Sequence, residues 1–255
     1  MQALVIANLT VRDLIRRRVF VLLFLFAMAL ILMAFILRDL TIGQWQRLIT
    51  DLGLGATDFS VTLMAIFIGA SLVAGDLDRR TALPVLAKPL SRTSYVVGRF
   101  LGLAGLLFIL TAVMVFTTGL MLLLAQQRGV SGFLFQNALT IGTGAVVLAA
   151  LAILFSAVTS STLAAIGALT LALAGHLTSN LEYFGHKIDA PVAKVLMLGL
   201  AKVVPNLEAL NLKDFAAHGQ SVGNPEVITR LGYGAGYAGL CVALASLFFL
   251  RRDLK

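Results

Sequence analysis

The charged side chains with the clearest spacing lie in one segment, Gly75–Gly102, between two long apolar runs. Only 13% of the chain is charged, yet this segment holds Asp76, Asp78, Arg79, Arg80, Lys88, Arg92 and Arg99. A loop of this composition must lie in water, and short loops rich in Lys and Arg remain on the cytoplasmic side of a membrane. We interpret this segment as the working surface of the protein. The alternative is a solvated connector that only fixes topology.

No catalytic residues, metal site or cofactor are predicted for this chain. The histidines are dispersed, although Glu182, His186 and Asp189 form a loose cluster that could bind a cation. Cys241 is the only cysteine, which excludes an intramolecular disulfide and a cysteine-based metal site. There is no G-x-x-x-x-G-K-[ST] pattern to hold ATP. An intramembrane enzyme is disfavoured because ionisable side chains are nearly absent from the middle of the apolar runs.

Composition places the chain among integral membrane proteins. Hydrophobic residues make up 59% of its 255 residues, and the mean hydropathy is +0.96. A soluble domain of this size could not cover so much apolar surface. The formal net charge of +8 does not indicate nucleic-acid binding, because the basic residues cluster at the ends of apolar runs, where they bind the lipid bilayer.

Six apolar runs are expected to be transmembrane helices, which makes the fold all-α. The first, Val19–Leu37, reaches about 28 Å as a helix, enough to cross the hydrocarbon core. The six predicted spans are residues 19–37, 56–74, 96–124, 135–157, 161–177 and 233–250. We interpret Asp58 as the cap of the second helix, after an outer loop over Arg38–Gly55. The alternative is a functional carboxylate within the membrane.

Met1–Arg18 is predicted to be an amphipathic elbow helix on the membrane surface. On a helical wheel Leu4, Ala7, Val11, Leu14 and Ile15 share one side, and Arg12, Asp13, Arg16 and Arg17 lie opposite. The alternative is an ordinary basic cytoplasmic tail.

The distribution of Lys and Arg sets the orientation. Twelve lie in the inner segments and eight in the much longer outer segments, so both termini are expected in the cytoplasm. Residues 75–95 then form a cytoplasmic loop, and residues 178–231 form an extracytoplasmic region. Within that region, Pro191–Val204 is too short to cross a bilayer. We expect a helix on the outer membrane face or on a partner, with a seventh crossing as the alternative.

Pairs of glycines spaced four apart are typical of closely packed membrane helices. Gly98 with Gly102 and Gly232 with Gly236 fit this pattern. Gly234, Gly236 and Gly239 also match G-x-G-x-x-G, but no strand precedes them, which argues against dinucleotide binding.

The whole chain resembles the permease subunit of type-2 ABC exporters, in the branch of copper-enzyme-maturation and gliding permeases. The resemblance lies in the amphipathic start, the six spans and the order of the loop motifs. These motifs are Asp76, Arg80-Thr81, Leu83 and Leu86, Lys88-Pro89, Ser91-Arg92 and Gly98-Arg99. The outer Val204-Pro205-Asn206-Leu207-Glu208 is also similar to that branch. Asp76, Arg80 and Arg99 depart from the more usual Glu, Gly and Lys.

The resemblance implies a subunit of a bacterial inner-membrane transporter that carries no ATPase site. ATP and magnesium would bind cytoplasmic ATP-binding cassette subunits. The loop residues Asp76, Asp78, Arg79, Arg80, Thr81, Lys88, Pro89, Arg92 and Arg99 would couple to them, through helical pieces at Asp78–Leu86 and Ser91–Phe100 separated by Pro89. A second permease copy, identical or different, would complete the complex.

The substrate is not specified by these motifs. Spans lined by apolar, Ser and Thr side chains favour a hydrophobic substrate, or force transmission to an extracytoplasmic partner, over a small ion. The competing class is a membrane scaffold or assembly factor that does not transport and whose basic loop contacts only lipid.

Overall fold

The computed structural model describes residues 2–16, 18–36, 45–78, 91–124, 131–178, 183, 187 and 191–251. This part of the chain is all-helical, as predicted. Its elements are α1 (Gln2–Ile15), α2 (Arg18–Ile36), α3 (Trp45–Asp78), α5 (Arg92–Leu124), α6 (Ser131–Val158), α7 (Ser161–His176), α9 (Pro191–Val203), the 3-10 turn η2 (Glu208–Leu210), α10 (Lys213–Ala217) and α11 (Asn224–Arg251).

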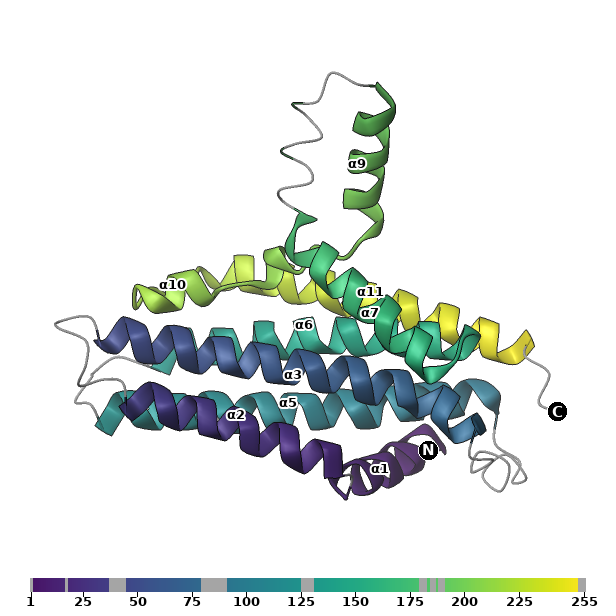
Figure 1. The fold of residues 1–255 in the computed structure, drawn as a ribbon, viewed down its shortest axis with the longest axis horizontal. Coiled ribbons are helices and arrows are strands. Elements are labelled where there is room, and N and C mark those ends of the chain that lie inside the picture. Colours follow the sequence, from purple (N-terminus) through teal and green to yellow (C-terminus); the bar gives the residue numbers. More distant parts are fainter. Residues whose placement is uncertain are drawn as a thin grey trace.

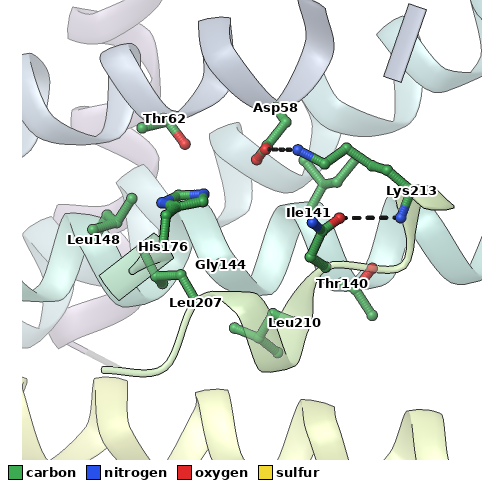
Figure 2. Close-up of a pocket in the computed structure, with 11 residues that line it drawn as sticks. Asp58, Thr62, Thr140, Ile141, Gly144, Leu148, His176, Leu207, Leu210 and Lys213 are labelled. Atoms are coloured by element: carbon green, nitrogen blue, oxygen red, sulfur yellow. Dashed lines mark hydrogen bonds and ion pairs between the residues drawn. The ribbon is translucent and has the colours of Figure 1, made fainter. Parts of the chain in front are cut away.

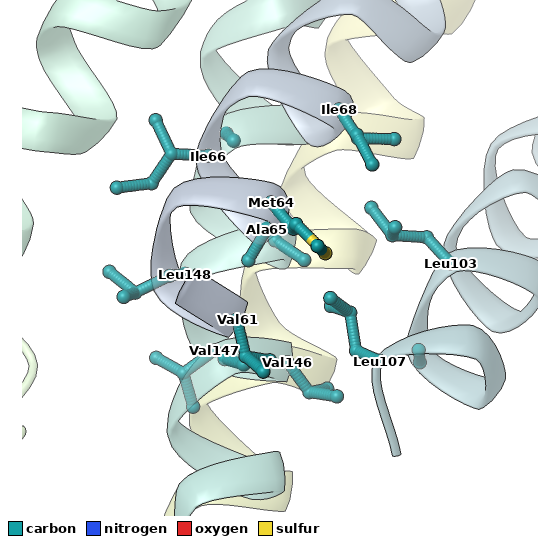
Figure 3. Packing of buried hydrophobic residues seen from close by; sticks show 14 of the residues in the cluster. Val61, Met64, Ala65, Ile66, Ile68, Leu103, Leu107, Val146, Val147 and Leu148 are labelled. Carbon is teal, nitrogen blue, oxygen red and sulfur yellow. The ribbon is translucent and has the colours of Figure 1, made fainter. Parts of the chain in front are cut away.

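The long helices lie side by side in one elongated bundle, with α6 packed against α3, α5, α7 and α11 (Figure 1). Most of α6 is apolar on all sides, which is typical of a helix at the centre of a bundle. Every residue from Ala145 to Leu151 is buried. Figure 3 shows the core beside it, where Met64 of α3 and Leu107 of α5 belong to one buried cluster with Val146, Val147 and Leu148 of α6.

Four helices are long and apolar enough to cross a membrane. These candidate spans are Arg47–Gly75, Thr93–Leu124, Gly132–Val158 and Asn224–Arg251. Two further apolar stretches, Phe24–Met33 and Ser161–His176, are shorter. Of the six predicted spans, four correspond to helices of sufficient length and hydropathy in the described residues, and crossing by α2 and α7 stays a prediction.

The bundle has two ends, here called the loop end and the cap end. At the loop end, α3 finishes at Asp78, α5 begins at Arg92 and the C-terminal end of α11 lies nearby (Figure 1). At the opposite cap end, α6 begins at Ser131 and α11 begins at Asn224. α1 also lies toward the loop end, at an angle to α2 (Figure 1).

α3 begins earlier than the sequence predicted. It starts at Trp45, so the expected outer loop is helical from that residue onward. Ile49 and Leu54 in this extension are fully buried, and Gly53 lies against the side chain of Thr118 on α5. Packing continues the helix past the purely apolar run. Asp58 consequently lies inside α3 and does not cap it, so that interpretation was wrong.

α1 buries a face that is rotated from the predicted one and shares Leu14 with it. Ile6, Thr10 and Leu14 are buried, whereas Leu4 is 67% exposed. The predicted stripe was chosen from hydrophobicity alone, but the observed one is set by contact with α5. The exposed side of α1 therefore still carries apolar side chains.

α9 stands away from the bundle, across the direction of the long helices (Figure 1). Its end is anchored by a hydrogen bond from the Tyr237 hydroxyl to the Val203 carbonyl, at 2.9 Å. Val192 and Val195 are more than 70% exposed. Within the described residues, no other helix packs along α9. Whether membrane or a partner covers it stays a prediction.

Candidate functional site

The first candidate site is the junction of α1 and α5 at the loop end. A methyl group added at Gly98 would lie 2.7 Å from the Cβ of Ile6, and one added at Gly102 would lie 2.6 Å from the Ala7 carbonyl oxygen. Both separations are shorter than real Cβ contacts allow, so only glycine permits the two helices to approach this closely. The structure thus places both glycines of the first pair in a helix contact.

Arg99 lies in this junction and is not a free loop residue. Its side chain is only 14% exposed, and its guanidinium lies 4.0 Å from the carboxylate of Asp13 on α1. It donates a long hydrogen bond of 3.5 Å to the Thr10 hydroxyl. The guanidinium carbon also lies 5.5 Å from the ring centre of Tyr95, within cation–π range. Arg99 therefore joins α1 to the start of α5.

The junction extends to the last helix. Tyr95 is buried and stacks on Phe249 of α11, with 5.8 Å between the ring centres. Ser91 accepts a hydrogen bond from the Ser94 backbone at 3.1 Å, as an N-cap of α5 does. The start of α5 is therefore held by its own cap, by α1 and by α11.

The remaining predicted coupling residues are only partly visible. Asp76 and Asp78 belong to the last turns of α3, and Arg92 begins α5. Their side chains are outside the described set, and Arg79, Arg80, Thr81, Lys88 and Pro89 lie outside the described residues altogether. Of the predicted coupling side chains, the structure places only Arg99.

The second candidate site is at the cap end, where residues 204–222, here called the cap segment, fold back onto the bundle. Leu207, Leu210, Leu212 and Ala216 of this segment are buried. Leu207 donates a backbone hydrogen bond to the Gly175 carbonyl at the end of α7, at 3.2 Å. The cap segment is therefore part of the packed core.

Polar clamps hold both ends of the cap segment. The side chain of Gln136 on α6 donates to the Val222 carbonyl at 2.7 Å and accepts from the Val222 backbone N–H at 2.9 Å. On α11, Arg230 donates to the Ala209 carbonyl at 2.5 Å, and the Tyr233 hydroxyl accepts from the Asn206 backbone at 2.9 Å.

An ion pair closes the middle of the cap segment. The Lys213 ammonium lies 2.5 Å from the Asp58 carboxylate on α3, and both side chains are about three-quarters buried. Beside the pair is a small cavity, which is also lined by Thr62, Thr140 and His176 (Figure 2). A partly buried ion pair loses hydration on both charges, and removal of one partner leaves the other charge uncompensated. The pair can therefore hold the cap segment closed.

The second glycine pair does not act as predicted within the chain. A Cβ at Gly232 or Gly236 would meet no other atom within 4 Å in the described residues. Gly234, between them, is the one pressed against α6, where a Cβ would lie 2.4 Å from the Thr143 methyl carbon. Residues two positions apart on an α-helix are rotated by about 200° about its axis. Gly234 therefore lies on nearly the opposite face of α11 from Gly232 and Gly236.

Sequence reasoning missed the cap segment and its ion pair. Asp58 and Lys213 are 155 residues apart, and neither belongs to a motif with fixed spacing. The only local signal was an acidic side chain near the start of an apolar run, which also fits a helix cap. Glu182, His186 and Asp189 lie outside the described residues.

Comparison with protein families assigns nearly the whole chain. The protein family described as "ABC-2 family transporter protein" matches residues 4–254. A search of curated proteins gave no match. With several membrane-capable helices in one bundle and a family match from α1 through α11, this multi-pass membrane protein belongs to the ABC-2 family of transporter proteins.

Proposed function

We propose that this protein is the membrane-spanning permease subunit of an ATP-driven type-2 exporter. The observation that carries the proposal is the family match over residues 4–254. In this proposal separate cytoplasmic subunits hydrolyse ATP, and this chain converts their movement into movement of its helices. It has no ATPase site of its own. The proposed location is the bacterial inner membrane, with six spans and both termini in the cytoplasm.

The loop end supplies the proposed coupling path. Residues 75–95 would contact the ATPase subunit through Asp76, Asp78, Arg79, Arg80, Thr81, Lys88, Pro89 and Arg92. α5 begins at Arg92, within the C-terminal part of this loop, and is fixed to α1 through Arg99 and to α11 through Tyr95. A displacement of the loop would therefore be passed to three helices together. In this proposal Arg99 is a positioning residue and does not itself contact the partner.

The exposed faces fit a complex with a second permease. Gly232 and Gly236 have open space beside them on α11, and α9 projects from the bundle (Figure 1). The proposal does not distinguish an identical copy from a different permease. The alternative function, a scaffold without transport activity, predicts a basic loop that contacts only lipid.

Reversal of the basic loop charges separates these functions. The variant combines Arg79→Glu, Arg80→Glu and Arg92→Glu. In the complex, these carboxylates would lie against an acidic groove of the ATPase. The repulsion between like charges costs several kcal/mol of binding free energy in a desolvated interface. We expect loss of copurification and of ATP turnover at a normal membrane level. For the scaffold, weaker lipid contact at about 1 kcal/mol per residue would leave partner binding intact.

A matched control uses three reversals in and shortly before α9, Lys187→Glu, Lys194→Glu and Lys202→Glu. These side chains are exposed and lie outside the proposed coupling surface. The control should retain ATPase binding and turnover. Unchanged copurification and turnover in the loop variant would contradict the coupling role.

A further inference from the structure

The cavity beside Asp58 has two walls of different chemistry. The bundle helices contribute the carboxylate of Asp58, the hydroxyl of Thr62 and the ring of His176, and Figure 2 shows these groups around one space. The cap segment contributes the ammonium of Lys213. Among the described lining residues, Lys213 therefore supplies the positive charge and Asp58 the negative charge.

The bundle wall is rich in hydrogen-bond acceptors. His176 Nδ1 lies 2.9 Å from the Ala172 carbonyl oxygen. A carbonyl can only accept, so Nδ1 carries the hydrogen, and an imidazole protonated at Nδ1 alone accepts at Nε2. The Thr62 hydroxyl can accept as well as donate, and an ionised carboxylate only accepts. This wall is complementary to a cation that carries several N–H donors.

We propose that the bundle wall around Asp58 is a binding site for a primary ammonium group carried on an apolar body, and that Lys213 occupies it as an internal ligand. The Lys213 ammonium is a compact charge with three donors, and its 2.5 Å approach to Asp58 shows how such a group fits. A ligand ammonium would replace Lys213 when the cap segment moves away.

The cavity is too small to hold a ligand and the Lys213 side chain at the same time, so the ligand ammonium must replace the Lys213 ammonium. The space open to the centre of a water molecule is about 20 Å³, enough for roughly one water. No organic ammonium fits while Lys213 is in place. In this proposal the side chain withdraws together with α10, a helix of only five residues that begins at Lys213.

The rest of the lining specifies the body of the ligand. Ile141, Leu148, Leu207 and Leu210 contribute apolar surface to the same cavity. Opening the cap segment would uncover more apolar surface, because Leu207 and Leu210 of that segment are buried when it is closed. The ligand class is therefore an amphiphile with a primary ammonium group. Its role as cargo rests on the proposed function, whereas its binding does not.

Hexylammonium is a suitable probe for the purified full-length protein in detergent. We expect Lys213→Met to bind labelled hexylammonium at least tenfold more tightly than wild type in equilibrium dialysis, because the internal competitor is gone. Hexanoate and hexanol, matched in chain length, should not gain affinity. Because ligand binding to the folded state raises stability, hexylammonium should also raise the melting temperature of Lys213→Met, and hexanoate should not. This second readout remains available if Lys213→Met is poorly stable.

The double variant Lys213→Met, Asp58→Asn should lose the gain, since the carboxylate is removed. Lys202→Met, which removes an exposed lysine of α9, should bind like wild type. Equal hexylammonium binding by wild type, Lys213→Met and the double variant would overturn the proposal. Equal binding of hexanoate or hexanol by Lys213→Met would also overturn it.

Competition identifies the source of the ammonium. Displacement of hexylammonium by dihexanoyl phosphatidylethanolamine, but not by the matching phosphatidylcholine, supports an aminolipid ligand. Displacement by longer alkylamines alone supports a soluble amine. Displacement by phosphatidylcholine as well contradicts recognition of a primary ammonium, because its quaternary nitrogen cannot donate hydrogen bonds. If the protein bound the ammonium specifically but never associated with an ATPase, the binding site would be confirmed and only its role in export would be contradicted.

Discussion

The carboxylate of Asp13 on α1 lies 4.0 Å from the guanidinium of Arg99 on α5. The two side chains differ in environment, since Asp13 is 50% exposed and Arg99 only 14% exposed. Solvent screens the exposed partner, so the ion pair itself contributes about 0–1 kcal/mol. The contact of Arg99 with Tyr95 is better shielded and adds about 0.5–1 kcal/mol. Packing around Arg99 should therefore matter more than the charge on Asp13.

Arg99→Met is expected to lower stability by about 1–2 kcal/mol, because it removes both the ion pair and the cation–π contact. Asp13→Asn should cost less than about 1 kcal/mol. Thermal unfolding of the two variants in the same detergent measures the difference. An Asp13→Asn loss as large as that of Arg99→Met would indicate that the ion pair dominates the junction.

Gly98→Ala should destabilise the protein by about 1–3 kcal/mol, as overpacking does. The added methyl would lie 2.8 Å from the Ala3 carbonyl oxygen, which is backbone and cannot rotate away. Gly236→Ala is the matched control on α11, where the added methyl meets open space. It should be neutral or stabilising by up to about 1 kcal/mol. A large loss in assembled complexes from Gly236→Ala would instead locate a partner helix there.

Cysteine labelling tests the proposed orientation. In a Cys241→Ala background, Ser91→Cys at the loop end should react only after the membrane is permeabilised, and Ser221→Cys at the cap end should react in intact cells. Both serines are exposed and lie at opposite ends of the bundle, whereas Cys241 is buried. Reaction of Ser91→Cys in intact cells would reverse the orientation.

Gln136→Leu is predicted to loosen the cap segment. It removes both hydrogen bonds to Val222, for a net loss of about 1–3 kcal/mol. A cysteine introduced at Leu210, which is 3% exposed, should then be labelled faster. Gln220→Leu changes an exposed glutamine of the same segment and serves as control. Equal labelling rates in the two variants would contradict the clamp.

Local properties of the sequence determined the class and most helix positions. Apolar runs must be long to cross a membrane, and polar residues mark where they begin and end. On this basis a helix was predicted at residues 161–177, and the observed α7 begins at Ser161 and ends at His176. Gly98 and Gly102 were also recognisable, because only small side chains allow helices to approach so closely. α3 was placed too short, because its first turns are stabilised by contact with α5 and not by continuous hydrophobicity.

Tertiary structure alone decided which faces meet. Gly234, not Gly232 or Gly236, contacts α6, since the rotation of a helix about its axis depends on its neighbours. The same holds for Arg99, whose place in the loop motif suggested a partner contact but whose side chain lies against α1. Asp58 and Lys213 form a pair only because the cap segment folds back across the bundle. Sequence spacing carries no information about such a contact, because the intervening chain follows a path set by packing.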